Sequence, residues 1–421
     1  MHRRSMLKAA LAATALGGLT VRQARAAAPA RVVVIGGGYG GATVARYLRT
    51  WSHGAVDVTL VEPDAAFVSC PLSNLVVAGY RQMADITVPY DALVRRHGVK
   101  HVRDTATAID AAKRTVRLAG GTTLPFDRLV LSPGVEMQAS AIAGLPEAGD
   151  QIVHAWKAGP QTETLRRQLA AMRDGGTFAI TIPLAPYRCP PGPYERACLV
   201  ADYLKQHKPR SKVLVFDANP DITSKGALFR QVWESRYKGM IEYRPQHETV
   251  GVDAASRTIR FDVQDDEKAD VINLLPPQRA GAIAVAAGLA TANGRWCEVD
   301  FLTMASKVAP EIHVLGDAVQ IAPLMPKSGT MANQHGKVAA AAILNQLAGR
   351  APDPTPLYTN TCYSFTSSTE AIHIASVHRY DPAQKTMVTV PGSGGLSKEP
   401  NALEGQYGFA WARSIWADML A

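Results

Sequence analysis

Residues 31–41 read Arg-Val-Val-Val-Ile-Gly-Gly-Gly-Tyr-Gly-Gly, an apolar run that ends in a glycine-rich turn. Four consecutive apolar residues, mostly β-branched, predict a short buried strand, and residues 42–50 predict the helix that follows it. Gly36, Gly38 and Gly41 have the G-x-G-x-x-G spacing that lets a backbone approach a pyrophosphate at a helix N-terminus. This order of strand, turn and helix predicts a Rossmann-like dinucleotide site.

A second strand, predicted over residues 56–61, ends at Glu62. An acid at this place in a Rossmann-like domain accepts a hydrogen bond from a ribose hydroxyl. The alternative is a glycine turn that serves packing alone, and the acid makes that alternative the weaker one. We therefore expect a bound dinucleotide, and the rest of the chain must indicate which one.

The chain has 421 residues, 47% of them hydrophobic and 19% charged, which is the composition of a globular protein with two or three domains. The formal net charge is +9, but five of the basic residues precede residue 27, where no acid is found. Without that stretch the net charge is +4, too small and too scattered to predict nucleic-acid binding.

Residues 1–26 have the pattern of a targeting segment rather than of a folded element. A twin arginine, Arg3-Arg4, precedes an apolar run over residues 9–21, and Ala24-Arg25-Ala26 fits a cleavage site. The pattern favours a Tat-type signal, with a Sec signal as the alternative, and either one predicts a periplasmic protein. The run is too short to cross a bilayer, and no other stretch has 18 uninterrupted apolar residues.

Five cysteines are present, and none has C-x-x-C spacing, so the sequence predicts neither a metal site nor a thioredoxin-like motif. The odd number means that at least one sulfur lies outside any internal disulfide. No C-x-x-C-H sequence occurs, so the chain itself is not expected to carry haem. The cysteines are Cys70, Cys189, Cys198, Cys297 and Cys362.

Two segments after the ribose acid have the positions of flavin-contacting loops. Cys70 precedes a proline on a non-helical stretch, which presents its side chain. Residues 128–131 predict a strand that ends in a small-residue turn with Ser132 and Gly134, at the place where the first FAD segment of two-dinucleotide flavoproteins ends.

A second domain is expected from about residue 144, but it lacks a second glycine motif. The predicted strand 177–182 runs into residues 183–193, which contain five prolines around Cys189. Prolines have no N–H to hold a phosphate, and no glycine turn opens the predicted helix 195–206. We therefore expect a Rossmann-like domain without nicotinamide binding.

The chain then returns to the first domain. Residues 309–317 predict a strand closing on Gly316 and Asp317, the second FAD fingerprint, in which the acid accepts from the ribityl chain. Thr330 precedes the predicted helix 331–347, whose N-terminus would stabilise negative charge on a reduced flavin. Together with the first glycine motif, this predicts FAD.

Residues 351–421 begin with three spaced prolines and contain Cys362. Their last segment, 409–420, bears tryptophan and is predicted to form a short amphipathic helix. The predicted architecture is α/β: two Rossmann-like domains plus a C-terminal α+β interface domain. The predicted divisions are a signal peptide (1–26), a first FAD-binding segment (27–143), the second Rossmann-like domain (144–275), a second FAD-binding segment (276–350) and the interface domain (351–421).

Four motifs together resemble the flavoprotein subunit of flavocytochrome c sulfide dehydrogenase: Cys70-Pro71-x-Ser73-Asn74, the proline-rich loop 188–196, Gly316-Asp317 and the late Cys362. The resemblance runs from about residue 31 to the C-terminus. It implies a glutathione-reductase-like fold for the two Rossmann-like domains and FAD attached through its 8α-methyl group to Cys70. It further implies a redox disulfide between Cys189 and Cys362, and an acidic residue, Glu195, beside it. It also implies a c-type cytochrome subunit that carries the haem.

The chemistry of such a pair suits sulfide. Hydrosulfide is a soft nucleophile, and attack on a disulfide would give a persulfide and release the second cysteine as a thiolate. FAD would convert the two-electron step into single-electron transfer to haem. Glu195 would accept a proton or set the local charge, whereas a helical glutamate could equally occupy a solvated surface position. A purely structural disulfide would explain the same cysteines, and a non-covalent flavin beside a free thiol would explain Cys70.

Three further functions compete with sulfide dehydrogenase. A sulfide:quinone oxidoreductase would share the fold and the cysteines but needs a membrane-binding surface, for which the Trp-bearing tail is a candidate. A non-enzymatic, exported FAD-binding scaffold for assembly or electron relay would contain a structural disulfide only. A nicotinamide-dependent disulfide reductase is disfavoured, because the second glycine motif and a closely spaced cysteine pair are missing.

Overall fold

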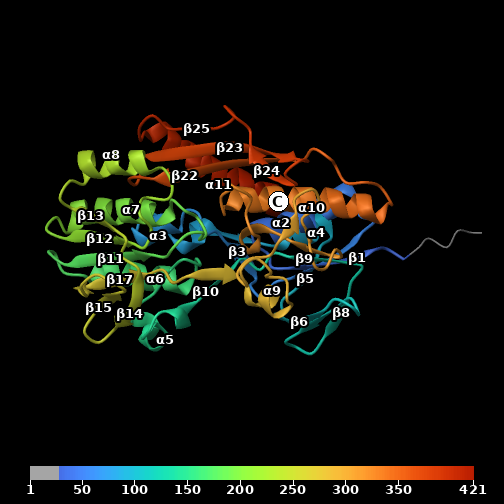
Figure 1. The fold of residues 1–421 in the computed structure, drawn as a ribbon, viewed down its shortest axis with the longest axis horizontal. Helices are drawn as coiled ribbons and strands as arrows, with labels where there is room; N and C mark the ends of the chain where they lie inside the picture. The colour runs from blue at the N-terminus through green and yellow to red at the C-terminus, as the bar shows by residue number, and fades with distance from the viewer. Residues whose placement is uncertain (1–27) are drawn as a thin grey trace, which may run out of the picture.

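The computed structural model describes residues 28–421, so the predicted targeting segment lies outside the described residues. Figure 1 shows a green α/β layer at one end, a layer built from blue and orange segments at the other, and the red C-terminal strands and helix along one side of both. The blue and orange segments are far apart in the sequence and form one unit, as the predicted return of the chain requires.

The first unit is built on a seven-stranded sheet with β1 near its centre, and β1 pairs in parallel with β2 and β9. Its β-branched residues are fully buried, as the sequence pattern predicts. The sheet runs in the order β19 (Val299–Asp300), β20 (Ala305–Ser306), β21 (Ile312–Val314), β9 (Arg128–Leu131), β1 (Arg31–Ile35), β2 (Asp57–Val61), β5 (Lys100–Val102).

The carboxyl ends of four adjacent parallel strands of this sheet carry the predicted cofactor motifs. Gly36 follows β1, Glu62 follows β2, Ser132 follows β9, and Gly316 follows β21 after one intervening residue. Parallel strands end at the same edge of a sheet, and ligands of open α/β sheets bind at that edge. The topology therefore collects at one place residues that are far apart in the sequence.

Two helices lie side by side on this sheet, α2 (Tyr39–Trp51) and α10 (Gly329–Leu347). Both begin before their predicted starts, because glycines that the sequence suggested as turn residues lie inside them. A Cβ on Gly336 would lie 2.7 Å from the Gly40 carbonyl oxygen. Glycine is therefore needed where the two helices cross closely.

The second unit has a four-stranded parallel sheet, and β11 has the predicted bounds. Its helix α7 begins at Gly192, before the predicted start, and is buried along most of its length. The strands, in sheet order, and the helices of this unit are β13 (Ile241–Pro245), β12 (Lys212–Asp217), β11 (Thr177–Ile182), β17 (Val271–Leu274), α6 (Pro160–Ala171), α7 (Gly192–His207) and α8 (Gly226–Arg236).

The C-terminal unit is an antiparallel sheet covered by one long helix, α11 (Ala402–Leu420). This helix is longer than the predicted 409–420: Asn401 caps it by accepting from the Glu404 N–H at 2.9 Å. The strands are β22 (Leu357–Phe365), β23 (Ala371–Asp381), β24 (Thr386–Thr389) and β25 (Gly395–Leu396).

Shorter elements connect these units. The strands are β3 (Ala66–Val68), β4 (Thr87–Pro89), β6 (Ala106–Asp110), β7 (Thr115–Leu118), β8 (Thr123–Pro125), β10 (Val135–Met137), β14 (Thr249–Asp253), β15 (Thr258–Phe261), β16 (Glu267–Lys268) and β18 (Gln278–Ala280). The helices are α3 (Ser73–Val77), α4 (Asp91–His97), α5 (Leu145–Ala148) and α9 (Ala282–Ala286), with 3₁₀ turns Met83–Ile86, Ala139–Ala141, Gly149–Gln151 and Gly316–Ala318.

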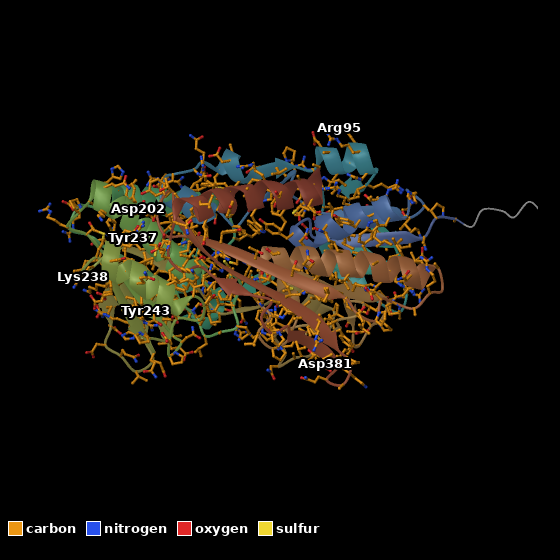
Figure 2. All side chains as sticks on the ribbon, turned by 90° about the horizontal axis from the view of Figure 1, so that it is seen from above. Arg95, Asp202, Tyr237, Lys238, Tyr243 and Asp381 are labelled. Atoms are coloured by element: carbon orange, nitrogen blue, oxygen red, sulfur yellow. The ribbon has the colours of Figure 1, made fainter. Side chains whose placement is uncertain are left out.

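Asp202 on α7 joins three regions of the chain (Figure 2). Its Oδ2 accepts from the Tyr80 hydroxyl at 2.7 Å and from the Ser368 N–H at 3.1 Å. Tyr237, also labelled in Figure 2, donates to the Thr366 carbonyl at 2.6 Å. These contacts fix the second unit against both the segment after Cys70 and the C-terminal sheet. The predicted α/β architecture of two Rossmann-like units with a C-terminal α+β unit is confirmed.

Candidate active site

A cavity of about 320 Å³ lies at the carboxyl ends of the first sheet. The loop before α7, the N-terminus of α10 and strand β22 close it from the other sides. Of the predicted site residues, Gly41 alone does not line this cavity. Those that do are Gly36, Gly38, Glu62, Cys70, Ser132, Gly134, Cys189, Glu195, Gly316, Asp317, Thr330 and Cys362.

The three motif glycines have separate structural roles. Gly36 has φ +93°, and a Cβ there would lie 2.3 Å from the Ser132 carbonyl oxygen. A Cβ on Gly41 would lie 1.8 Å from the Gly36 carbonyl oxygen, so this glycine permits helix-to-strand packing. A Cβ on Gly38 would meet nothing within 4 Å, because Gly38 faces the cavity. The space left there and the acid-free first turn of α2 fit a pyrophosphate.

Two carboxylates lie where the ribose and the ribityl chain of FAD require hydrogen-bond acceptors. Glu62 is held by the Gly37 N–H, 2.8 Å from its Oε2, and lines the cavity at the predicted ribose position. The Oδ1 atom of Asp317 is buried and has no hydrogen-bond partner among residues 28–421. Burial raises the pKa of Asp317, with Arg188 and Lys327 opposing that rise. An orphaned buried acceptor fits a ribityl hydroxyl, so these residues fit FAD.

The N-terminus of α10 also faces the cavity, through Ser328, Gly329 and Thr330. Ser328 caps the helix by accepting from the Met331 N–H at 3.0 Å. The Thr330 hydroxyl donates to the Thr361 carbonyl at 2.8 Å, so its side chain is bound to β22. The residue can therefore offer its backbone, rather than its hydroxyl, to a cofactor.

Cys70 is a half-buried thiol on the turn between β3 and α3. The Ala158 N–H points to its Sγ at 3.5 Å. The next turn is strained, because Leu72 has φ +72° and caps α3. The turn thus presents the sulfur to the cavity, as the sequence predicts.

Cys189 and Cys362 enter the same cavity from different units. Cys189 has φ +58°, and its N–H donates to the Lys327 carbonyl at 2.9 Å. A Cβ on Gly192 would lie 2.9 Å from the Cys189 Sγ, so a glycine is required at the start of α7. Cys362 lies in the middle of β22, opposite Ile374. Both residues are free thiols in this structure.

The cavity resists ionisation of these thiols. Burial raises the pKa of Cys189 well above its ordinary value, and Cys362 and Glu195 add to the rise. Burial also raises the pKa of Cys362. Two cations oppose these shifts: Arg188 and Lys225 act on Cys189, and Lys225 acts on Cys362.

Glu195 is buried, with 7% of its surface exposed, so the alternative of a solvated helix position is wrong. Its Oε1 accepts from the Phe365 N–H at 3.0 Å and its Oε2 from the Asn74 amide at 3.1 Å. Burial raises the pKa of Glu195 to about 6, against those hydrogen bonds and Lys225. A carboxyl with this pKa can exchange a proton near neutral pH.

Several residues of the site have no role that the sequence alone assigns. Arg196 is 1% exposed and donates to Asn74 Oδ1 at 2.8 Å and to Asn273 Oδ1 at 2.7 Å. Lys327 is buried, and burial lowers its pKa to about 7. Arg188 and Arg196 lie in the proline-rich loop 188–196, so their place in that motif is a signal that could have found them. No local pattern distinguishes Lys327 or Lys225 from a surface lysine.

The tryptophans of α11 face inward. Trp411 lines the cavity and stacks against Tyr39 with 6.5 Å between ring centroids, and the Trp416 indole N–H donates to the Tyr39 hydroxyl at 3.3 Å. The predicted amphipathic tail is therefore a packed helix whose aromatic residues help to build the site. Within residues 28–421 no helix is both long and apolar enough to cross a membrane.

The second unit offers no free acid for a nicotinamide nucleotide at the end of β12. Asp217 ends this strand, where a Rossmann-like domain places its ribose acid. Here the Asp217 carboxylate accepts from Tyr194 at 2.6 Å, Tyr243 at 3.0 Å and the Asn219 N–H at 2.9 Å. The Asp217 carboxylate is therefore bound to neighbouring residues of its own unit rather than free to accept from a ribose. This agrees with the expectation, drawn from the missing glycine motif, that the unit does not bind a nicotinamide nucleotide.

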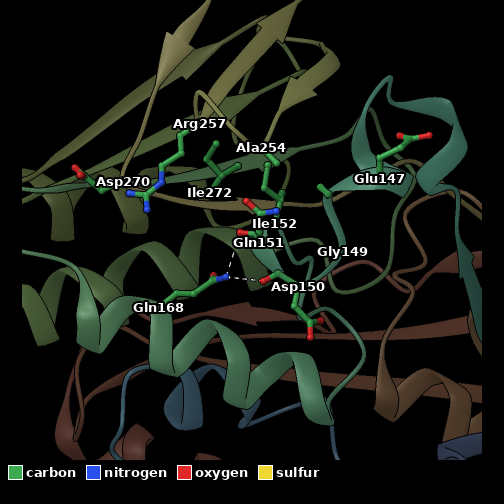
Figure 3. Close-up of a pocket in the computed structure, with 11 residues that line it drawn as sticks. Glu147, Gly149, Asp150, Gln151, Ile152, Gln168, Ala254, Arg257, Asp270 and Ile272 are labelled. Atoms are coloured by element: carbon green, nitrogen blue, oxygen red, sulfur yellow. Dashed lines mark hydrogen bonds between the residues drawn. The ribbon is translucent and has the colours of Figure 1, made fainter.

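A second cavity, of about 530 Å³, lies in the second unit near α5 and β17 (Figure 3). Gln168 spans it by donating to the Asp150 carbonyl at 2.8 Å and to the Gln151 carbonyl at 3.1 Å. This cavity contains neither a cysteine nor any predicted site residue. The chemistry therefore belongs to the first cavity.

The fold and the site define an FAD-type oxidoreductase of the pyridine nucleotide-disulphide class, and the comparisons agree. Residues 30–173 match the family model "Pyridine nucleotide-disulphide oxidoreductase". Residues 162–276 match "Sulfide dehydrogenase [flavocytochrome c] flavoprotein chain, central", and residues 354–420 match "Flavocytochrome c sulphide dehydrogenase, flavin-binding".

Among curated proteins, the sulfide dehydrogenase flavoprotein chain of Chlorobaculum thiosulfatiphilum is 61% identical over 46 residues, which are 11% of this chain and 94% of that sequence. The chain belongs to this family, that of the flavoprotein chain of flavocytochrome c sulfide dehydrogenase. The mitochondrial sulfide:quinone oxidoreductase of Dictyostelium discoideum is 24% identical over 68% of this chain, and the match spans 65% of that protein's length. The structure of the Aquifex aeolicus sulfide:quinone oxidoreductase aligns with a TM-score of 0.76 at 19% identity, over 93% of this chain and 91% of that one.

Proposed function

We propose that this protein oxidises sulfide at the Cys189–Cys362 pair, with FAD as the electron acceptor, and passes the electrons to a c-type cytochrome. The observation that carries this proposal is the convergence of two cysteines and a buried glutamate in the cavity that holds the flavin motifs. Residues from two separate units form this cluster, and the flavin motifs beside it come from the first unit. A structural disulfide would not need the flavin motifs or a buried carboxyl beside it.

The reaction begins with the oxidised pair. Hydrosulfide attacks one sulfur of the disulfide, the S–S bond breaks, and the products are a cysteine persulfide and a cysteine thiolate. The loop of Cys189 and strand β22 hold both sulfurs in the cavity, which removes the entropy cost of bringing them together. Glu195, as a carboxylate, accepts the proton of the persulfide.

FAD, when bound, supplies a two-electron acceptor that can release electrons singly to haem. The residues that would hold it are Gly36 and Gly38 at the pyrophosphate, Glu62 at the ribose and Asp317 at the ribityl chain. Cys70 is the proposed attachment point for the 8α-methyl group. The haem belongs to a partner chain, and the proposed compartment is the periplasm.

An anaerobic sulfide titration of the purified holoprotein tests this proposal. Sulfide should bleach the flavin absorbance at about 450 nm, and Cys189→Ser and Cys362→Ser should abolish the bleaching. Cys198→Ser is the matched control, because this buried thiol instead accepts from the Trp233 indole at 3.2 Å and lies outside the cavity. If wild-type flavin stays oxidised, the enzymatic proposal is wrong and the scaffold alternative takes its place.

Acid precipitation tests the covalent bond separately. Flavin colour should stay with the wild-type pellet and move to the supernatant for Cys70→Ser. A colourless wild-type pellet would disprove attachment at Cys70 and leave the sulfide chemistry in place.

A sulfide:quinone oxidoreductase remains the second candidate, supported by the full-length likeness of the fold to such an enzyme. The acceptor separates the two functions. Turnover with cytochrome c and none with a short-chain quinone supports the first, and the reverse supports the second.

A further inference from the structure

Lys225 is a buried lysine that reaches out of the second unit toward the redox pair. It precedes α8 with φ +58° and is 6% exposed. Its Nζ donates to the Cys362 carbonyl at 2.8 Å and to the Ser364 hydroxyl at 2.9 Å. The side chain therefore fixes the stretch of β22 that carries Cys362.

The hydrogen bonds of Lys225 distinguish it from another buried lysine of the same unit. The Nζ of Lys208 donates to three carbonyl oxygens, those of Leu169, Ala170 and Met172. The Nζ of Lys225 donates to only one carbonyl oxygen and one neutral hydroxyl. Burial of an ammonium is costly unless nearby negative charge compensates it, and the ionisable groups beside Lys225 are Glu195, Cys189 and Cys362.

The charges that face the two sulfurs come from three elements. Glu195 on α7 contributes one negative charge when ionised, and Arg188, Arg196 and Lys225 contribute positive charges; Tyr187 beside Cys189 is neutral. Arg188 affects the pKa of Cys189, whereas Lys225 affects both thiols and is the cation that opposes the rise in the pKa of Cys362. With both cysteines in a disulfide, this cluster is positive and suits an anionic nucleophile.

We propose that Lys225 is a positioning residue of the redox pair, whose ammonium stabilises the thiolate that hydrosulfide attack releases at Cys362. The new bond joins the sulfide sulfur to the Cys189 Sγ, the Cys189–Cys362 bond breaks, and the electron pair of that bond stays on the Cys362 Sγ. Lys225 acts through its charge and through the backbone of β22. This inference rests on the proposed function and adds the residue that stabilises the leaving thiolate.

Alkylation of the reduced holoprotein tests the charge directly. The rate of Cys362 modification by iodoacetamide is followed against pH by peptide mass spectrometry, with flavin content and melting temperature recorded for each variant. Lys225→Gln keeps a hydrogen-bond donor and removes the charge. In this variant, Cys362 should be alkylated about tenfold more slowly at pH 7 than in wild type, which is equivalent to one pKa unit of the thiol. Lys225→Arg should restore the rate.

Two further variants complete the test. Lys208→Gln removes a buried lysine that lies away from the sulfurs and should leave the profile unchanged. Glu195→Gln removes the negative charge and should accelerate alkylation, and it still tests the charge balance if Lys225→Gln does not fold. Identical profiles for folded wild-type and Lys225→Gln proteins, or slower alkylation in Glu195→Gln, would overturn the proposal.

The outcome is separable from that of the proposed function. If sulfide fails to bleach wild-type flavin but Lys225→Gln still slows alkylation, the proposed function is wrong while the effect of Lys225 on the thiolate stands. If bleaching occurs and alkylation does not change, the function stands and Lys225 has no electrostatic role.

Discussion

The Phe365 backbone N–H donates to Glu195 Oε1 at 3.0 Å, and this bond joins the helix after Cys189 to the strand that carries Cys362. One carboxyl group therefore links two units and faces the two sulfurs between them. The Asn74 amide holds its other oxygen. A proton acceptor fixed on both oxygens keeps its place while the bonds between the sulfurs change.

The pH dependence of turnover should follow Glu195. In the proposed reaction its carboxylate form accepts the proton, so kcat at saturating sulfide should rise as pH increases through about 6. Glu195→Gln should lose this acid limb and about 100-fold of rate, a typical contribution of general base catalysis. Glu163→Gln, on an exposed residue of α6, is the control. An acid limb that survives in Glu195→Gln would assign the proton transfer to another group.

The same carboxyl group should affect stability with a defined sign. Because its pKa is raised from 4.5 to about 6 by burial, the folded state binds a proton more tightly than the unfolded state. Stability from this group is therefore full below about pH 4.5 and falls by about 2 kcal/mol as pH rises through 6. Urea unfolding of wild type and Glu195→Gln, compared across this window, measures it. If the unfolding free energies of the two proteins change with pH in parallel, burial does not raise the pKa of Glu195.

The motif glycines should separate cofactor binding from folding. Gly38→Ala places a methyl group in the open cavity, so the protein should fold but retain little FAD, and its melting temperature should equal that of FAD-free wild type. Gly41→Ala places a methyl group 1.8 Å from the Gly36 carbonyl oxygen and should destabilise the protein by about 3 kcal/mol. Flavin content per chain and thermal unfolding measure both. Full FAD occupancy in Gly38→Ala would disprove the pyrophosphate assignment.

Arg196 should contribute strongly to stability. Burial lowers its pKa to about 10, and the guanidinium donates to two asparagine side chains and to the carbonyl oxygens of His154 and Ala155. Arg196→Met removes the donor to the two asparagine oxygens and the Ala155 carbonyl, and should cost about 3 kcal/mol in urea unfolding. Arg96→Met, on an exposed residue of α4, should change little.

NADH and NADPH should not reduce the flavin. The carboxylate at the end of β12 is occupied by Tyr194, Tyr243 and Asn219, and the proline-rich loop supplies few N–H donors. Anaerobic mixing monitored at about 450 nm should show no bleaching, while dithionite reduces the same sample. Bleaching at rates similar to those with sulfide would mean that the second unit still binds a nicotinamide nucleotide.

The cofactor motifs were predictable because each is local. A glycine spacing, an acid at a strand end and a Gly-Asp turn are determined within a few residues, and the parallel sheet then brings them together. Cys189 was predictable for the same reason, because the prolines next to it restrict the backbone regardless of where the loop lies in the fold.

Burial of polar residues could not be predicted in this way. Glu195 and Lys225 have local surroundings typical of surface helices, and distant strands bury them. The length of α11 was underestimated because Gly405 and Gly408 resemble helix breakers. A Cβ on Gly405 would lie 1.9 Å from the Thr369 carbonyl oxygen, so this glycine instead permits close contact with the loop between β22 and β23.

The four strand ends that hold the flavin also set the order of events during synthesis. Gly36 leaves the ribosome early, whereas Asp317 and the first turn of α10 emerge only when most of the chain has been made. A nascent chain that ends before residue 317 contains the glycines proposed to bind the pyrophosphate but lacks the acid proposed to bind the ribityl chain. Flavin loading must therefore be a late event, and a chain arrested before residue 317 should emerge colourless.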